Sequence, residues 1–280
     1  MGEPLDAAIA NRQTRLTLTI GAGALIAFWL FPVVWMVSTS FKASPEITSR
    51  VPLFIFRPIL AHYRTLLYTY HFSRYFQTSF FVASVTTVIT MVLGSLAAYA
   101  LGCIERARSK DIAMWILSQR MMPPIAVVIP FFILFRVFDL IDTRLGLIVI
   151  YLVPALPFAV WLLRSFFRDI PGEIREAALL DGLRHWQVLR RIVAPIASPG
   201  IAVTAIFTFI FTWNEFLFAL FLTSERATTV PVGISQLVLA YQVLWGEVAA
   251  AGTLALLPLL PVVFYLQRHI VRGMTLGAVK

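Results

Sequence analysis

Long apolar segments recur along this chain and are separated by polar ones. The segments cover residues 17–41, 75–104, 112–135, 145–163, 196 to about 222, and 248–267. A helix needs about 20 apolar residues to cross the hydrocarbon core of a bilayer. The pattern therefore predicts an all-α integral membrane protein with six transmembrane helices.

The first of these segments is long and free of charge. Residues 17–41 give 25 positions without a charged side chain, after a polar start. The apolar core of a cleaved signal peptide is typically about 7–15 residues long. We therefore expect a retained first span.

Composition agrees with a membrane protein. Hydrophobic residues make up 59% of the chain and charged residues 13%, whereas soluble domains carry about 25% charged residues. The single cysteine, Cys103, excludes an internal disulfide. The four histidines are scattered without the spacing of metal ligands, and we expect no metal site and no catalytic residue.

The formal charge of +9 raises the question of nucleic-acid binding. Six spans place both termini on one side, and 14 of the 23 Lys and Arg residues fall in the segments on that side. Eight fall on the other side, mostly in one long loop, and Arg120 lies inside a span. Because basic residues accumulate in cytoplasmic loops, we expect cytoplasmic termini and no nucleic-acid partner.

A polar segment, residues 173–199, lies between the fourth and fifth apolar segments. Residues 173–180 favour a helix, with Glu173 and Glu176 near its positive end. Asp181-Gly182 ends it, since glycine adopts the left-handed backbone found at helix ends. Residues 183–193 predict a second helix. On this topology the helix-turn-helix lies at the cytoplasmic surface, where small Ala177 and Ala178 would admit a partner protein.

The spacing in this segment resembles the EAA signature of ABC importer permeases. Here it reads Glu176-Ala177-Ala178, three residues, Gly182, nine residues, Ile192, one residue and Ala194-Pro195. The resemblance implies a coupling helix that docks on a cytoplasmic ATPase subunit. The docking residues would then be Glu173, Glu176, Ala177, Ala178, Asp181, Gly182, Ile192 and Pro195.

Further motifs over roughly residues 75–280 are similar to the maltose-type (MalG-like) carbohydrate permeases. They are Phe166-Phe167-Arg168-Asp169-Ile170-Pro171, Trp213-Asn214-Glu215-Phe216, Asp142-Thr143 with Gly146-Leu147, and the tail around Val271-Arg272-Gly273. The resemblance implies partners: a second permease subunit, two cytoplasmic ATPase subunits and an external solute-binding protein. It also implies that the C-terminal tail, with Gly277 and Lys280, reaches the ATPase.

The chain lacks its own nucleotide site. A P-loop needs Gly-Lys-Ser/Thr to cradle phosphate, and the three lysines follow Phe, Ser and Val. We therefore expect no cofactor in this chain, with ATP and magnesium held by the partner ATPase.

Three polar residues at the depth of a span are candidates for the translocation path or its gate: Arg120, Asn214 and Glu215. An arginine at the centre of a span costs about 2.5–3.5 kcal/mol on insertion scales, so Arg120 should face a cavity or the bundle interior. Snorkelling to the cytoplasmic surface is an equal alternative for Arg120. For Asn214 and Glu215 a structural role between helices is favoured.

Four residues near the last external loop have chemistry suited to sugars or to the binding protein: Gln236, Tyr241, Gln242 and Trp245. They combine hydrogen-bonding groups with an aromatic face. Ordinary interfacial residues explain them at least as well.

We therefore expect one transmembrane permease domain over residues 1–280. The coupling loop covers about residues 168–195, and the external loops cover about 42–74 and 223–247. The function would be import of a sugar, oligosaccharide or related polyol or sugar derivative across a bacterial or archaeal plasma membrane. The alternative is a stand-alone secondary transporter, a class that usually shows internal repeats and several buried charges. A membrane enzyme would need clustered catalytic groups, and the sequence shows none.

Overall fold

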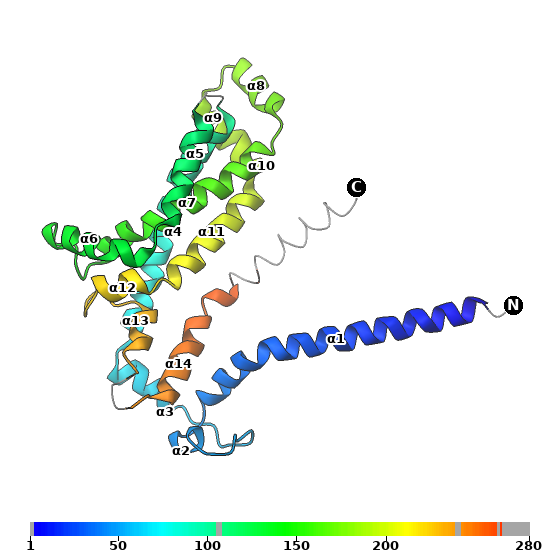
Figure 1. Ribbon diagram of the computed structural model, residues 1–280, viewed down its shortest axis with the longest axis vertical. Helices are drawn as coiled ribbons and strands as arrows, with labels where there is room; N and C mark the ends of the chain where they lie inside the picture. Colours follow the sequence, from blue (N-terminus) through cyan, green and yellow to red (C-terminus); the bar gives the residue numbers. More distant parts are fainter. Residues whose placement is uncertain (1–2, 105–107, 239–241, 262–263, 265–280) are drawn as a thin grey trace. The chain divides into compact units, whose positions relative to one another are not determined.

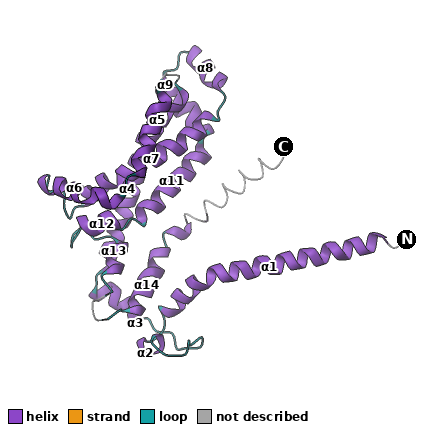
Figure 2. Cartoon of the chain, viewed as in Figure 1, coloured by secondary structure: helices purple, strands orange, loops and turns teal. Residues whose placement is uncertain are grey.

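The structure, a computed structural model, describes residues 3–104, 108–238, 242–261 and 264. Helices account for almost all of the regular structure in these residues (Figure 2). The chain divides into two compact units. The first is drawn from residues 1–70 and 237–254, and the second from residues 71–236 and 255–280.

The first unit contains a long helix, several short ones and most of a later helix (Figure 1). Its helices are α1 (Glu3–Thr39), α2 (Ser44–Ile47), α3 (Ala61–Arg64), the π-helical turn η1 (Thr65–Thr69) and α14 (Trp245–Leu256). The predicted external loop at residues 42–74 thus holds short helices joined by irregular chain.

A buried histidine ties this loop to the start of α14. The Nε2 atom of His62 lies 2.8 Å from the Lys42 carbonyl oxygen, and its Nδ1 atom lies 3.1 Å from a Glu247 carboxylate oxygen. The imidazole ring lies against Gly246, where any Cβ atom would collide with it. Loop and helix are therefore held together by specific polar contacts.

The second unit is built on two long helices, α4 (Phe72–Cys103) and α7 (Arg144–Arg168). Its other helices are α5 (Ser109–Ser118), the 3₁₀ turn η2 (Gln119–Met121), α6 (Pro124–Val137), α8 (Gly172–Leu180), α9 (His185–Val188), the π-helical turn η3 (Leu189–Val193), α10 (Ala194–Ile196), α11 (Ser198–Trp213), α12 (Leu217–Leu222) and α13 (Val230–Ser235).

Three described helices are long and apolar enough to cross a membrane. They are Thr17–Thr39, Phe72–Cys103 and Arg144–Arg168, and they match the first, second and fourth predicted spans. Two bent helix pairs raise the number to five if each pair is counted as one span. The sixth predicted segment is described in part, as the shorter apolar helix Trp245–Pro261.

The third predicted span is more sharply interrupted than a kinked helix. Its two halves, Ser109–Met121 and Pro124–Val137, meet at 91°. Met122 and Pro123 are both extended where the helix stops. Proline lacks an N–H group and disfavours helical geometry in the residue before it, so Pro123 and Pro124 favour an interruption of the helix at this point.

The fifth predicted span, residues 196 to about 222, is also discontinuous. Helix α11 ends at Trp213, and α12 starts at Leu217 after a short break. Before the span, the segments His185–Ile196 and Ser198–Trp213 meet at 85°.

Small residues allow α4 and α7 to approach closely. Gly94, Ala98 and Gly102 recur every four positions, so they share one face of α4. A Cβ atom at Gly94 would lie 3.2 Å from the Ala159 Cβ atom, and one at Gly102 would lie 3.1 Å from the Arg164 Cγ atom. Small residues at such spacing are typical of helix pairs in membranes.

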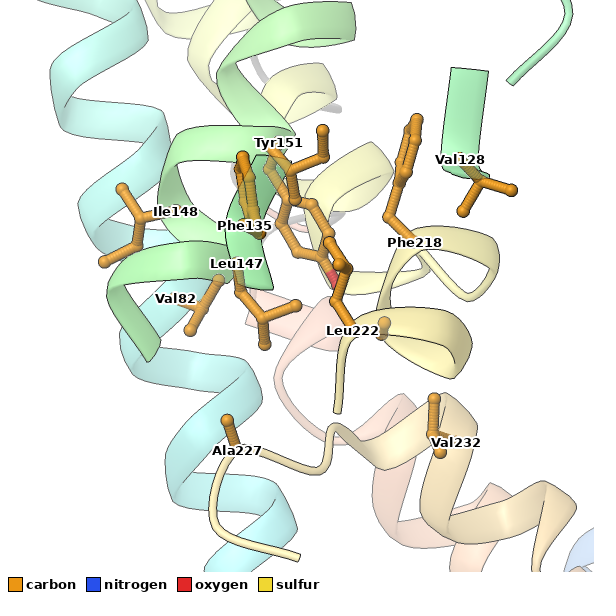
Figure 3. Close-up of a cluster of buried hydrophobic side chains, with 12 residues drawn as sticks. Val82, Val128, Phe135, Leu147, Ile148, Tyr151, Phe218, Leu222, Ala227 and Val232 are labelled. Carbon is orange, nitrogen blue, oxygen red and sulfur yellow. The ribbon is translucent and has the colours of Figure 1, made fainter. Parts of the chain in front are cut away.

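A hydrophobic cluster fills the space beside the first half of α7 (Figure 3). It draws buried side chains from α4, α6, α7, α12 and α13: Val82, Val128, Phe135, Leu147, Ile148, Tyr151, Phe218, Leu222 and Val232. The short helix α12 is therefore packed as a core element although it has only six residues.

Asp142 fastens the loop before α7 to the segment after α12. Its carboxylate accepts hydrogen bonds of 3.0–3.3 Å from the backbone N–H groups of residues 224–227. Its own N–H donates to the Leu222 carbonyl oxygen at 2.8 Å. The next residue, Thr143, caps α7 by accepting from the Gly146 N–H group at 3.0 Å. A Cβ atom at Gly146 would collide with the Leu140 carbonyl oxygen, so the Asp-Thr-x-x-Gly motif has a structural basis.

These hydrogen bonds change the acidity of the Asp142 side chain. Partial burial raises the pKa of the carboxyl group, but the backbone donors of Arg226, Ser224, Ala227 and Glu225 outweigh burial and lower the pKa from 3.8 to about 2. The folded state therefore favours the ionised form. The stability that Asp142 contributes is complete above pH 3.8 and is lost as the pH falls toward 2.

We expect Asp142→Asn to lower the free energy of unfolding near neutral pH by roughly 1–2 kcal/mol, because a neutral amide accepts these N–H groups less well. The gap between wild type and variant should close as the pH falls from 3.8 toward 2. Thermal unfolding of the detergent-solubilised wild type and variant across this pH range measures the gap. Asp139→Asn is the matched control, since Asp139 is exposed and also has a positive φ. A gap independent of pH would contradict the carboxylate account.

Candidate functional site

The segment predicted to couple to a partner begins with helix α8, at residues 172–180. Pro171 precedes the first helical residue, and Glu173 lies in the first turn, where a carboxylate suits the positive end of the helix. The Arg175 Nη1 atom donates to the Ile170 carbonyl oxygen at 3.0 Å. This bond attaches α8 to the chain leaving α7.

Gly182 ends α8 as predicted, with a φ of +84°. The Leu183 N–H group donates to the Ala178 carbonyl oxygen at 3.1 Å, and the Gly182 N–H group donates to the Leu179 carbonyl oxygen at 3.0 Å. This pair of bonds is the Schellman motif. A Cβ atom at Gly182 would have no neighbour within 4 Å, so the backbone angle and not space is what requires glycine.

The second helix of the segment differs in detail from the predicted one at residues 183–193. It starts at His185, after Arg184 in an extended conformation, and continues from residue 189 to 193 as a π-helical turn. The Gln187 side chain accepts from the Arg184 N–H group at 2.8 Å. Leu189 and Val193 are buried, but Trp186 is 54% exposed and does not join them.

One face of this segment packs on the ends of α4 and α7. Ala178, Val188, Leu189 and Val193 share a buried cluster with side chains of the two long helices: Ala98, Tyr99, Leu163 and Phe167. The Tyr99 hydroxyl oxygen also lies 3.3 Å from the His185 Nδ1 atom. The helix-turn-helix is therefore fixed to the long helices.

Most of the predicted docking residues point away from this cluster. Glu173, Glu176, Ala177, Asp181, Gly182 and Pro195 are exposed, and Ile192 is partly buried. Ala178 was expected on the docking face but is only 5% exposed. It lies on the inward face of α8, one helical position from exposed Ala177. Leu180 is 89% exposed at the tip, which leaves a large apolar side chain uncovered.

The breaks in the third and fifth predicted spans border a cavity of about 230 Å³. Its lining combines polar and aromatic side chains, namely Arg120, Tyr151, Phe158, Thr208, Thr212 and Glu215, with apolar neighbours. The Arg120 guanidinium carbon lies 5.0 Å from the centre of the Phe158 ring. Arg120 therefore lines this cavity, while its side chain is also exposed.

Glu215 also reaches this cavity but has a structural task. Its carboxylate accepts from the N–H groups of Phe218 at 2.9 Å and Ala219 at 3.2 Å, so it caps α12. Asn214 is exposed and donates from Nδ2 to the Ile210 carbonyl oxygen at 2.8 Å. The structure thus places Arg120 and Glu215 on one cavity, while Asn214 is not among the lining residues.

Aromatic lining residues on α7 were not singled out from the sequence. Tyr151 and Phe158 are seven positions apart, with Pro154 and Ala155 between them, so all four share a helical face that lines the cavity. This spacing was a usable signal.

The remaining predicted contacts lie elsewhere. Gln236, Gln242 and Trp245 are exposed. Tyr241, Gly277 and Lys280 lie outside the described residues. Among the residues the structure describes, no group of three or more His, Cys, Asp or Glu side chains could hold a metal ion.

Residues 91–276 match the family described as binding-protein-dependent transport system inner membrane component. The probable ABC transporter permease protein y4oR of Sinorhizobium fredii is 38% identical over 271 residues, covering 96% of this chain and 98% of the relative. The trehalose/maltose transport system permease protein MalG of Thermococcus litoralis is 36% identical over 270 residues, covering 95% and 97%.

A third relative is the trehalose transport system permease protein SugB of Mycobacterium tuberculosis, 36% identical over 91% of this chain and 94% of its own. Among solved structures, a chain of a bacterial ABC transporter that imports the acidic polysaccharide alginate superimposes with a TM-score of 0.75 at 22% identity, covering 92% of this chain and 97% of that one. This chain belongs to the family of binding-protein-dependent transport system inner membrane components, the permease subunits of ABC importers.

Proposed function

We propose that this permease subunit imports a sugar, an oligosaccharide or a related polyol or sugar derivative. Relatives named for trehalose, maltose, sulfoquinovosyl glycerol and diacetylchitobiose support this class of solute. A stand-alone secondary transporter is not favoured, because the family works with separate binding proteins. The exact solute differs among these relatives, so we propose the chemical class of the solute and not one compound.

The proposed topology has six spans with both termini in the cytoplasm and one permease domain over residues 1–280. The excess of basic residues in the segments on the side of the termini supports this orientation. On this topology α8–α10 face the cytoplasm and the Asp142 loop faces outward. The membrane is the plasma membrane of a bacterium or archaeon, as the named relatives suggest.

The proposed partners are a second permease subunit, an external solute-binding protein and two cytoplasmic ATPase subunits. A solved relative of low identity was crystallised as a transporter in complex with a periplasmic protein that carries an alginate pentasaccharide. ATP and magnesium would be held by the ATPase subunits, and this chain would perform no bond chemistry. Gln236, Tyr241, Gln242 and Trp245 are proposed contacts of the binding protein, and Gly277 and Lys280 of the ATPase.

The exposed tip of the helix-turn-helix is the observation that carries the coupling role. Leu180 leaves a large apolar side chain uncovered, and Glu173, Glu176 and Ala177 lie on the same exposed helix. An apolar residue surrounded by polar ones is typical of a protein contact. Because the opposite face is buried on α4 and α7, a movement of the docked ATPase would be transmitted to the two longest helices of this unit.

The cavity at Arg120 is proposed to line the translocation path or its gate. Aromatic faces and hydroxyl groups suit a polyhydroxylated solute, and Phe158, Tyr151, Thr208 and Thr212 supply both. The two threonine hydroxyl groups donate to carbonyl oxygens of their own helix, so they are available to a solute as acceptors. Arg120 holds its position over Phe158 by a cation–π contact. Glu215 contributes by keeping the break between α11 and α12 in place.

The turn at Gly182 provides a test of the coupling role. We expect Gly182→Ala to reduce co-purification of the ATPase by about 5- to 30-fold, because a non-glycine residue in the left-handed region costs about 1–2 kcal/mol. Gly182→Asn should have a smaller effect, since asparagine tolerates this backbone conformation better. The measurement is the ATPase yield in a pull-down from native membranes.

Gly172→Ala is the matched control for the turn variants. Gly172 opens α8, and a Cβ atom there would meet only side-chain atoms at an ordinary 3.6 Å. It should leave the yield unchanged. If Gly182→Ala keeps a full complement of ATPase and full solute uptake, the coupling role of this turn is wrong.

For the cavity, we expect Arg120→Ala to lower solute uptake while the complex still assembles. Losing a cation–π contact of about 0.5–2 kcal/mol corresponds to between about twofold and thirtyfold in rate. Uptake into proteoliposomes and subunit stoichiometry are the two readouts. Unchanged uptake in a fully assembled variant would remove Arg120 from the path.

A further inference from the structure

A second and larger cavity, of about 830 Å³, lies at the end of the second unit where α4 ends and α5 begins. Helix α7 and residue Arg175 of α8 complete its wall. The lining residues that the structure describes are Leu101, Gly102, Cys103, Ile104, Ser109, Lys110, Met114, Arg164, Arg168 and Arg175. We define this as the basic cavity.

Four cationic side chains from three helices converge on the basic cavity, and its described lining includes no carboxylate. Two of them are fixed in place: the Arg164 Nε atom donates to the Leu101 carbonyl oxygen at 3.1 Å, and Arg175 is held by the Ile170 carbonyl oxygen at 3.0 Å. A guanidinium group has five N–H donors. Both arginines therefore keep donors for a ligand.

Gly102 makes room for the arginine stems. A Cβ atom there would lie 3.1 Å from the Arg164 Cγ atom and 3.3 Å from the Arg168 Cγ atom. The small residue thus lets both side chains cross the end of α4. Basic residues in a cytoplasmic loop are expected from topology alone, but topology does not require them to meet in one cavity.

The first residue of helix α5 adds a neutral hydroxyl group to this wall, and Asp111 lies in the same first turn without being among the lining residues. Ser109 is 9% exposed, and its hydroxyl oxygen is buried without a hydrogen-bond partner among the described residues. It is the first residue of a ten-residue helix that has no side-chain cap. The first N–H groups of a helix lack internal partners and favour an anion.

Exposed apolar residues follow on the same helix. Ile112, Met114 and Trp115 are 46%, 59% and 66% exposed. In a multi-pass membrane protein, such residues beside a basic cavity suit acyl chains next to an anionic headgroup.

We propose that the basic cavity binds a phosphate group, most readily that of an anionic phospholipid of the cytoplasmic leaflet. Phosphate matches guanidinium groups and helix N-termini in charge and geometry. Since Arg175 belongs to α8, an occupant would also brace the coupling helix against α7. A free phosphate would use the same groups. A carboxylate of a docked protein is the competing occupant.

The single cysteine of the chain offers a direct probe, because Cys103 lines the basic cavity. The full chain, purified with the subunits that accompany it, is placed in nanodiscs of phosphatidylcholine with or without phosphatidylglycerol. The rate of Cys103 labelling by an uncharged maleimide is measured. We expect phosphatidylglycerol to slow labelling roughly tenfold, the effect of a ligand at about ten times its Kd.

Three sets of variants control this experiment. Lys110→Gln with Arg168→Gln removes two exposed charges from the basic cavity and should abolish the protection. Arg190→Gln with Arg191→Gln removes two exposed charges outside it and should leave the protection intact. A Ser198→Cys, Cys103→Ser variant reports any general effect of the charged membrane on the reagent, and should show no protection.

Adding inorganic phosphate to phosphatidylcholine nanodiscs distinguishes the two sources of the phosphate group, a lipid headgroup and free phosphate. Protection by phosphatidylglycerol alone supports the lipid, and equal protection by inorganic phosphate supports a free phosphate. The proposal is overturned if neither phosphatidylglycerol nor inorganic phosphate protects Cys103. It is also overturned if both double variants lose protection equally, or if protection follows the ATPase content regardless of lipid. Labelling of Cys103 does not require transport, so a failure of the phosphate-binding proposal would leave the proposed permease function untouched.

Discussion

The close approach of α4 and α7 is the constraint on which the rest of the second unit depends. Gly94, Ala98 and Gly102 give α4 a face with almost no side-chain volume, and Ala159 and Arg164 of α7 lie directly against it. Lipid chains are as apolar as the helices, so close van der Waals packing has to supply the association that the hydrophobic effect supplies in water. A larger side chain on this face would push α4 and α7 apart, and the segments at both ends of the unit pack on these two helices.

Different contacts stabilise the two ends of the α4–α7 pair. At one end Asp142 holds the segment after α12 with its carboxylate, and Thr143 caps α7. At the other end the helix-turn-helix is packed on Tyr99, Leu163 and Phe167. The cavity at Arg120 lies between, at positions where helices are broken and backbone groups need side-chain partners. A movement of the coupling segment would therefore pass along continuous helices toward a discontinuous region.

Apolar segment length and turn chemistry were enough to predict much of this. Three spans, the helix at residues 173–180 and its end at Gly182 follow from composition and from the left-handed backbone that glycine allows. The 91° bend at Met122–Pro123 could not be predicted in this way. A proline pair can kink or break a helix, and tertiary packing decides which. The inward position of Ala178 and the convergence of Arg164, Arg168 and Arg175 on one cavity depend on contacts between distant segments, which a single sequence does not encode visibly.

The proposed coupling role requires the exposed tip of α8 to dock on a cytoplasmic ATPase. The most direct measurement places a photo-crosslinking amino acid at Leu180, the 89% exposed tip residue, and identifies the adduct in intact membranes by mass spectrometry. The same amino acid at Leu60, an exposed loop residue of the first unit, is the control. We expect an ATPase adduct at position 180 and none at position 60. An adduct at position 180 with lipid alone, in cells that carry out solute uptake, would contradict it.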